Sequence, residues 1–302
     1  MRAFLTNKFM KYLSLFSGIG GFELGIGGKA ECIGYSEIDK YAIQIYEKHF
    51  PTHTAFGDIT KIEAATLPNF DLLVGGFPCQ SFSIAGKRGG FSDTRGTLFF
   101  EIARIAREKQ PRFLLLENVK GLLSHDKGRT FYTIISTLDE LGYDCQWQVL
   151  NSKNFGVPQN RERVFIIGHL RGTRRPQVFP FGEDDKIYPI NSKGTKSKTK
   201  HTFSTIATNT KRKESNYIRQ PLRFLTRNQK NIEGDYSFTV DASQTSGIRK
   251  GDKIRRLTPT ECERLQSFPD DWTEGVSDTQ RYKCLGNAVT VNVVQAIIEK
   301  LL

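Results

Sequence analysis

The sequence predicts an α/β fold in which a doubly wound, mostly parallel sheet carries a second, small and mostly β lobe. Over residues 12–170, short apolar runs alternate with segments of helical spacing. The apolar runs do not alternate with polar residues, which is typical of strands buried on both faces. Between residues 171 and 251 polar and basic residues dominate, which indicates the irregular lobe. The 302 residues suffice for one large domain and a smaller lobe.

The elements follow in order from these patterns. Predicted strands span residues 12–16, 31–36, 54–56, 70–74, 113–116, 146–150 and 164–167, with short extended candidates at 222–225 and 236–240 in the lobe. Predicted helices span residues 39–49, 97–109, 130–141 and 291–302, where apolar side chains recur at helical spacing. Pro111 and Gly142 end the second and third of these helices. A further helix begins at Thr258, because Pro259 suits its first position and Glu261 completes a capping box.

Composition narrows the class of protein. No apolar run approaches the roughly 18 residues of a membrane span, and residues 1–12 lack the features of a secretory signal. The five cysteines are scattered and form no CxxC pair, which argues against a disulfide framework and a cysteine-rich zinc site. We therefore expect a cytoplasmic protein without a metal.

The positive charge is concentrated in one segment. The chain has 44 Lys and Arg against 32 Asp and Glu, a net charge of +12. Residues 171–256 hold 20 basic and 8 acidic residues, which accounts for the whole excess. Such a segment is either a solvated basic loop or a contact for a polyanion such as nucleic acid.

Chemically useful residues follow the predicted strands at their carboxyl ends. They are the glycine turn at Gly18, then Glu37, Asp58, Cys79 and Glu117. Ligands of open α/β sheets bind outside these ends. The turn departs from the dinucleotide fingerprint GxGxxG, because Glu23 occupies the third glycine position, which counts against NAD.

Two features keep alternative interpretations open. Cys79 follows Pro78, which stiffens the approach to the thiol, yet most free cysteines are small buried hydrophobes. Arg161 and Arg163 are two residues apart, so in an extended chain they share a face. They either aim two guanidinium groups into the site or lie on the surface.

Six ordered motifs resemble those of the bacterial DNA cytosine-5 methyltransferases of restriction-modification systems. They are residues 16–22 (FSGIGGF), 76–80 (GFPCQ), 117–119 (ENV), 159–163 (QNRER), 256–269 (RLTP to FP) and 286–289 (GNAV). The resemblance covers nearly the whole chain except the basic segment, which occupies the place of the variable target-recognition region. It implies a Rossmann-like domain dependent on S-adenosylmethionine, at residues 1–175 with 285–302. It further implies a target-recognition lobe at 176–260 and a hinge segment at 261–284.

The resemblance also implies the cofactor and its contacts. S-adenosyl-L-methionine would meet Phe16, Gly18, Gly20, Gly21, Glu37, Ile38, Asp58, Ile59, Pro78, Leu98, Asn287 and Ala288. Glu37 would hold the ribose and Asp58 the adenine amino group. Ile38 stands where the family often has an aromatic residue, and Ser14 where it often has an acid.

The implied reaction is methyl transfer to carbon-5 of a flipped-out cytosine through a covalent adduct. Cys79 would attack carbon-6, Glu117 would bind ring nitrogen-3, and Arg161 and Arg163 would favour the thiolate and hold the base. Ser83, Arg95 and Thr239 are the expected DNA contacts.

The expected partner is double-stranded DNA, bound by a monomer that works beside a cognate restriction endonuclease. Two alternatives stay open: a tRNA cytosine-5 methyltransferase with the same core, and a DNA-binding regulator without catalysis. The intact Cys79, Glu117 and Arg163 disfavour the regulator.

Overall fold

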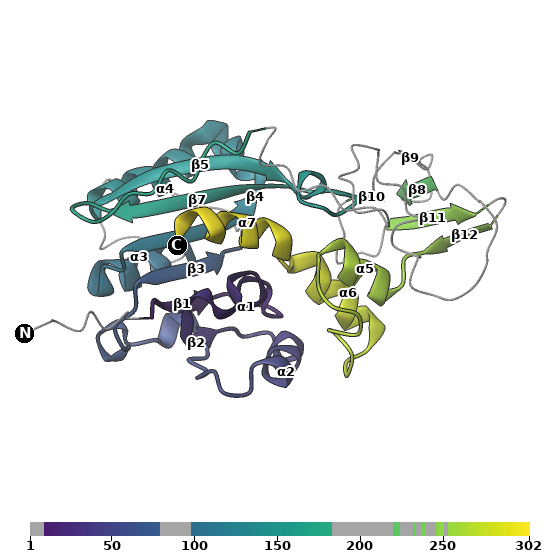
Figure 1. The fold of residues 1–302 in the computed structure, drawn as a ribbon, viewed down its shortest axis with the longest axis horizontal. Helices are drawn as coiled ribbons and strands as arrows, with labels where there is room; N and C mark the ends of the chain where they lie inside the picture. Colours follow the sequence, from purple (N-terminus) through teal and green to yellow (C-terminus); the bar gives the residue numbers. More distant parts are fainter. Residues whose placement is uncertain are drawn as a thin grey trace, which may run out of the picture.

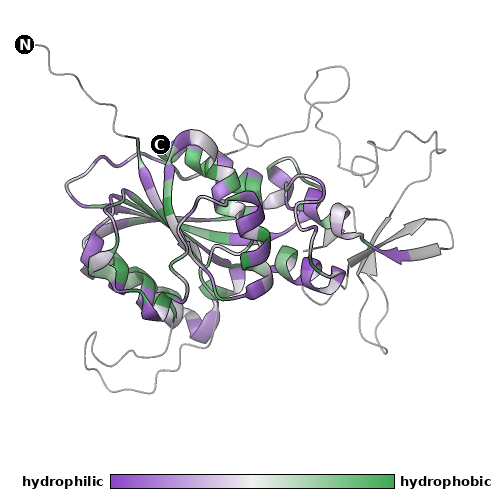
Figure 2. Ribbon diagram, turned by 90° about the horizontal axis from the view of Figure 1, so that it is seen from below, coloured by the Kyte–Doolittle hydropathy of each residue, from purple (hydrophilic) through white to green (hydrophobic). Residues whose placement is uncertain are grey.

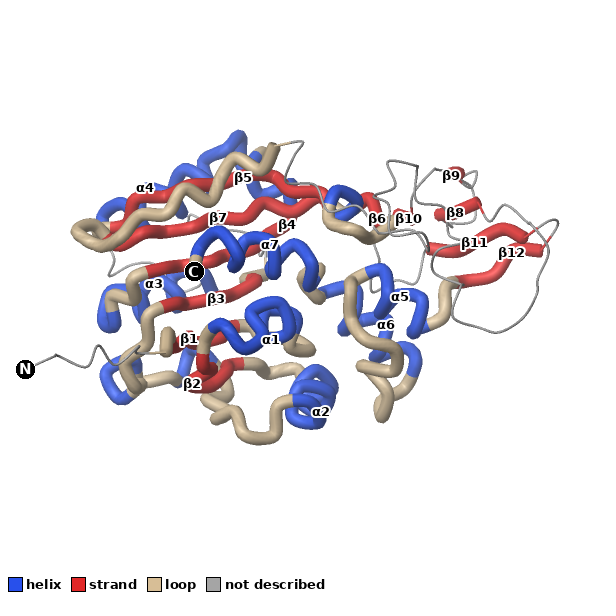
Figure 3. The backbone as a smooth tube through the Cα atoms, in the orientation of Figure 1, coloured by secondary structure: helices blue, strands red, loops and turns tan. Residues whose placement is uncertain are grey.

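The computed structural model describes residues 9–78, 98–182 and 253–302, together with the backbone of short strands between residues 220 and 250. Its centre is a six-stranded sheet of order β2-β1-β3-β4-β7-β5 (Figures 1 and 3). The strands are β1 (Lys11–Leu15), β2 (Glu31–Ser36), β3 (Leu72–Gly76), β4 (Phe113–Val119), β5 (Tyr143–Asn151) and β7 (Glu162–Leu170). The first four in chain order run parallel, whereas β7 is antiparallel to both β4 and β5. The predicted fold class is confirmed.

Helices cover both faces of this sheet. The helices are α1 (Gly21–Ile26), α2 (Lys40–His49), α3 (Leu98–Lys109), α4 (Arg129–Glu140) and α7 (Val291–Leu301). Successive strand residues point to opposite faces, so Leu72 and Val74 pack with α1 and α7, whereas Leu73 packs with α3 and α4. Figure 2 shows hydrophobic and hydrophilic residues alternating along these flanking helices, as a two-sided core requires.

The segment at 54–56 is not a strand, so that prediction is wrong. Ala55 forms a single isolated bridge with Tyr35 of β2. Gly57 follows with a φ of 68°. This left-handed backbone turns the chain away before a ladder can extend.

The second sheet is small and antiparallel, in the order β12-β11-β8-β9. Its strands are β8 (Gln220–Arg223), β9 (Ile232–Glu233), β11 (Ser246–Lys250) and β12 (Lys253–Arg256). Separately, β10 (Ser237–Phe238) pairs with β6 (Gln159–Asn160). These strands agree with the expected mostly β lobe.

After this sheet the chain returns to the main domain through α5 (Pro259–Leu265) and α6 (Asp278–Asn287). The predicted capping box of α5 is confirmed, with Thr258 and Glu261 bonded reciprocally and Pro259 in the first turn. Leu265 and Leu285 form a hydrophobic cluster with Ile45 of α2. The C-terminal helices thereby close one end of the sheet.

Two glutamines on the edge strand β5 hold the segment that leaves the main domain. The Gln146 amide donates to the Pro176 carbonyl and accepts from the amides of Val178 and Phe179. The Gln148 amide exchanges both kinds of bond with the backbone of Phe181. The two side chains thus replace strand pairing at this edge.

Among the described residues, no helix combines the length and the apolar character needed to cross a membrane.

Candidate active site

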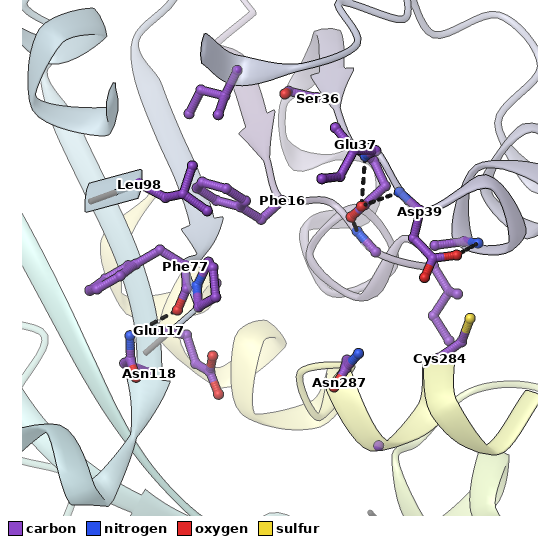
Figure 4. Close-up of a pocket in the computed structure, with 18 of the residues that line it drawn as sticks. Phe16, Ser36, Glu37, Asp39, Phe77, Leu98, Glu117, Asn118, Cys284 and Asn287 are labelled. Atoms are coloured by element: carbon purple, nitrogen blue, oxygen red, sulfur yellow. Dashed lines mark hydrogen bonds between the residues drawn. The ribbon is translucent and has the colours of Figure 1, made fainter. Parts of the chain in front are cut away.

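One cavity of about 500 Å³ lies at the carboxyl ends of β1 to β4. In Figure 4, Glu37, Asp39, Cys284 and Asn287 lie on one side and Leu98, Phe77 and Glu117 on the other. The predicted site residues that line it are Phe16, Gly18, Glu37, Ile38, Asp58, Ile59, Pro78, Leu98, Glu117, Arg161, Arg163 and Asn287. The structure therefore brings together carboxylates, guanidinium groups and a glycine turn that are far apart in the sequence.

The glycine turn exposes its backbone to the cavity. Phe16, Gly18 and Gly20 all have left-handed backbone, with φ of 53°, 56° and 86°. A Cβ built on Gly18 would meet no atom within 4 Å, so open space lies above this residue. A side chain there would be strained and would occupy that space.

Glu37 lines the cavity next to the glycine turn, and its carboxylate accepts hydrogen bonds from three backbone amides. Its Oε2 accepts from the Gly18 amide at 2.9 Å, and its Oε1 accepts from the amides of Ile38 and Asp39 at 2.8 and 2.9 Å. Asp39 in turn caps α2 and pairs with Lys283 of α6 at 2.6 Å. The carboxylate of Glu37 thus joins the glycine turn to the start of α2.

Glu117 and Arg163 form an ion pair inside the cavity. The Arg163 Nε lies 3.0 Å from Glu117 Oε1, and the two side chains are only 16 and 12% exposed. Burial raises the pKa of Glu117, against the opposing effects of Arg163 and Arg161. This carboxyl therefore holds a proton more readily than an exposed glutamate does. Gly76 leaves room for it, because a Cβ there would lie 3.1 Å from Glu117 Oε2.

Arg161 is buried and turns toward the C-terminal segment. Its Nη2 donates to the carbonyls of Gly286 and Ala288 at 3.0 and 2.8 Å. Burial, with a smaller contribution from Arg163, lowers the pKa of its guanidinium. Arg161 thus fixes the backbone on either side of Asn287, which lines the cavity.

Asn118 was not among the predicted site residues. Its Nδ2 donates to the carbonyl of Phe77 at 2.8 Å, and its Oδ1 accepts from the Val119 amide. The side chain is buried. It therefore fixes the peptide before Pro78, the last described residue ahead of Cys79. The signal in the sequence was its place in the motif at residues 117–119, directly after Glu117.

Some predicted residues do not line the cavity. Gly20 packs against the ring of Phe50, and Gly21 packs against Val289. Ala288 contributes the carbonyl that Arg161 binds. Cys79, Ser83, Arg95 and Thr239 lie outside the described residues. For all of these, the predicted roles stay predictions.

One protein family and its curated members match nearly the whole length of this chain. The family model for C-5 cytosine-specific DNA methylases matches residues 10–302. The type II methyltransferase M.HpaII of Haemophilus parainfluenzae is 42% identical, over 99% of this chain and 90% of that protein. The type II methyltransferase M1.ScrFI of Lactococcus lactis subsp. cremoris is 41% identical, over 99% of this chain and 80% of that protein.

Solved structures resemble this fold at low sequence identity. The Dnmt2 methyltransferase of S. pombe is 19% identical with a TM-score of 0.69, over 97% of this chain and 98% of that one. A DNMT2 mutant from Spodoptera frugiperda is 22% identical with a TM-score of 0.65, over 97% and 99% of the two chains. At this identity the likeness establishes the fold alone.

Proposed function

This chain belongs to the family of C-5 cytosine-specific DNA methylases and is a DNA cytosine-5 methyltransferase; from that premise we propose how it works. It transfers a methyl group from S-adenosylmethionine to carbon-5 of a flipped-out cytosine within a specific double-stranded sequence. The names of its type II relatives support a role as the modification enzyme of a restriction-modification system. It acts in the cytoplasm as a monomer beside a cognate endonuclease, and residues 176–260 read the target.

The cavity has the groups that the cofactor requires. The open backbone at Gly18 admits a ligand to the turn. Phe16, Ile38 and Leu98 offer apolar surface for an adenine ring, while Glu37 and Asn287 offer polar groups for the ribose and the amino-acid end. S-adenosylmethionine would supply an electrophilic methyl group here. The reacting cytosine must therefore reach the same cavity.

The observation that carries this proposal is the partly buried Glu117–Arg163 pair, which shares the cavity with both Pro78 and the glycine turn. A carboxyl with a raised pKa can carry a proton to ring nitrogen-3. The neighbouring guanidinium orients that carboxyl and favours negative charge nearby. Pro78 brings the chain to this point one residue before Cys79.

The proposed chemistry begins with the thiolate of Cys79. It adds to carbon-6 of cytosine, so that a sulfur–carbon bond forms and the electron pair of the 5,6 double bond moves to carbon-5. Glu117 provides a proton at nitrogen-3 as negative charge develops on the ring. Carbon-5 would then take the methyl group, whose bond to the sulfonium sulfur would break and leave S-adenosylhomocysteine. Transfer of the carbon-5 proton to water restores the 5,6 double bond, breaks the bond between carbon-6 and sulfur and releases the thiolate, while the proton on nitrogen-3 returns to Glu117.

The target base must leave the duplex, because carbon-6 is not accessible to a side chain within the stack. Flipping costs a few kcal/mol of stacking and pairing. The basic residues between 171 and 256 would compensate through phosphate contacts. Binding would then weaken steeply as salt rises, and a flat salt response would contradict this role.

Bisulfite sequencing tests the proposal directly. Duplex DNA incubated with the protein and S-adenosylmethionine should gain 5-methylcytosine at one short sequence. Cys79→Ala should abolish methylation, whereas Cys145→Ala should retain it, because Cys145 lies on β5 away from the cavity. Methylation by Cys79→Ala would contradict the covalent mechanism. In a separate assay with S-adenosylmethionine that carries a radiolabelled methyl group, transfer of the label to tRNA instead of DNA would favour the RNA-modifying alternative.

A further inference from the structure

A tryptophan near the C-terminus contacts the glycine turn near the N-terminus. The indole Nε1 of Trp272 donates to the carbonyl of Ile19 at 2.8 Å, across 253 residues of sequence. The Trp272 side chain is 7% exposed, and Ile19 is 1% exposed. Ile19 also lines the cavity. The bond therefore joins the segment between α5 and α6 to the wall of the candidate cofactor pocket.

Neighbouring aromatic rings hold the indole in place. The imidazole of His49 stacks on it with centroids 3.6 Å apart and an interplanar angle of 5°. The same imidazole bonds to the Trp272 carbonyl through Nε2 at 2.7 Å. The ring of Phe50 meets the indole edge-on and also packs against Gly20. Trp272 thus has little freedom to release Ile19.

The turn that Trp272 contacts needs external support. Phe16 is a non-glycine residue with left-handed backbone, a conformation in which its Cβ crowds the neighbouring carbonyl. On the side facing β2, Ser17 donates to the Ser36 carbonyl and the Gly18 amide donates to Glu37. Trp272 supports the other side of the turn. Without the indole donor the buried Ile19 carbonyl would lose this partner, so its peptide would favour other orientations.

We propose that Trp272 is a positioning residue for the cofactor, which fixes the peptide after Ile19 and thereby keeps the Gly18 backbone open to the ligand. This rests on the proposed binding of S-adenosylmethionine in the cavity. The chain from α5 to α6 carries both Trp272 and Asn287. It therefore reaches the cofactor pocket twice, directly through Asn287 and indirectly through the bond from Trp272 to Ile19.

The chain offers a matched control, because it contains two tryptophans. Trp272→Phe keeps an aromatic ring against His49 but removes the N–H donor. Trp147→Phe changes the other tryptophan, which is 48% exposed on β5 away from the cavity. Calorimetric titration with S-adenosylhomocysteine should give a Kd about tenfold higher for Trp272→Phe and unchanged for Trp147→Phe. At saturating cofactor, kcat of Trp272→Phe should stay within about twofold of the original protein.

A second measurement needs no change at position 272. In Trp147→Phe the remaining tryptophan is Trp272, so its fluorescence reports on the turn directly. Addition of S-adenosylhomocysteine should shift the emission. An unchanged Kd in Trp272→Phe, or an emission that does not respond to bound cofactor product, would overturn the inference. If the original protein itself does not bind S-adenosylhomocysteine, the proposed function fails instead.

Discussion

Glu117 and Arg163 meet diagonally across the antiparallel pair of β4 and β7. In the ladder Glu117 lies opposite Phe165 and Val119 lies opposite Arg163. The two charged residues are therefore offset by two residues along the strands, which keeps both side chains on the same face of the sheet. Their side chains close this offset with a separation of 3.0 Å. The sheet register therefore determines which arginine reaches the carboxylate.

Replacement of Glu117 should remove catalysis without removing the cofactor. Glu117→Gln keeps the shape of the side chain but loses proton transfer, so kcat should fall by about 10²–10⁴-fold. The Kd for S-adenosylhomocysteine should change less than about threefold. Radiolabelled methyl transfer and calorimetry measure the two quantities.

A nearby ion pair provides the control for this variant. Lys120 and Glu162 are also 3.0 Å apart, but their side chains are 56 and 43% exposed. Glu162→Gln should leave kcat within about twofold, because exposed pairs contribute little. Equal losses in the two variants would remove the special role assigned to Glu117.

Arg161 should matter more for stability than the exposed Arg175 does. Arg161→Ala leaves the carbonyls of Gly286 and Ala288 without their buried donor. A buried carbonyl left without its donor costs about 1–3 kcal/mol. Urea unfolding should show this loss. Arg175→Ala, which breaks an exposed pair with Asp144, should cost less than about 1 kcal/mol.

The two arginines also show where sequence reasoning ends. Their spacing predicted a shared face, and both line the cavity. Arg161, however, lies between β6 and β7, where the backbone is not a regular strand. It bonds to residues 286 and 288, whereas Arg163 on β7 bonds to Glu117. Spacing gives the direction of a side chain only while the chain stays regular.

The strand ends were predictable because local patterns determine them. Apolar runs defined the strands, and the parallel arrangement then brought Gly18, Glu37 and Glu117 to one edge. Trp272 and Lys283 were not predictable in this way. Their partners Ile19 and Asp39 are more than 240 residues away, and no local pattern specifies such pairs.

Asn118 should affect both stability and catalysis. Asn118→Ala leaves the buried carbonyl of Phe77 without its donor, which costs about 1–3 kcal/mol. This peptide leads through Pro78 to Cys79, the proposed nucleophile. A change in its orientation should therefore lower kcat as well. Asn292 makes a similar bond, to the carbonyl of Phe155 at 2.9 Å, away from the cavity. Asn292→Ala should lower the melting temperature without lowering kcat; a normal kcat in Asn118→Ala would refute the positioning role.

Glu23 should make the stability of the protein depend on pH. Its carboxyl is buried behind the glycine turn, where Oε1 accepts from the Tyr46 hydroxyl at 3.0 Å. Within the described part of the chain, Oε2 has no hydrogen-bond partner. The Tyr46 hydroxyl also bonds to His53 Nδ1 at 2.9 Å, and the thiol of Cys32 and the phenol of Tyr12 interact with the carboxyl. Burial raises the pKa of Glu23 from 4.5 to about 7.

The sign of the effect follows from this shift. Between pH 4.5 and 7 the unfolded chain releases the Glu23 proton while the folded protein retains it. Folding stability therefore falls as pH rises through this window, by about 3 kcal/mol. Glu23→Gln removes the titration, so it should be more stable than the original protein at pH 8, with the difference shrinking toward pH 5. Urea unfolding at several pH values measures this, with the exposed Glu299→Gln as control; a difference that does not change between pH 5 and 8 would contradict the raised pKa of Glu23.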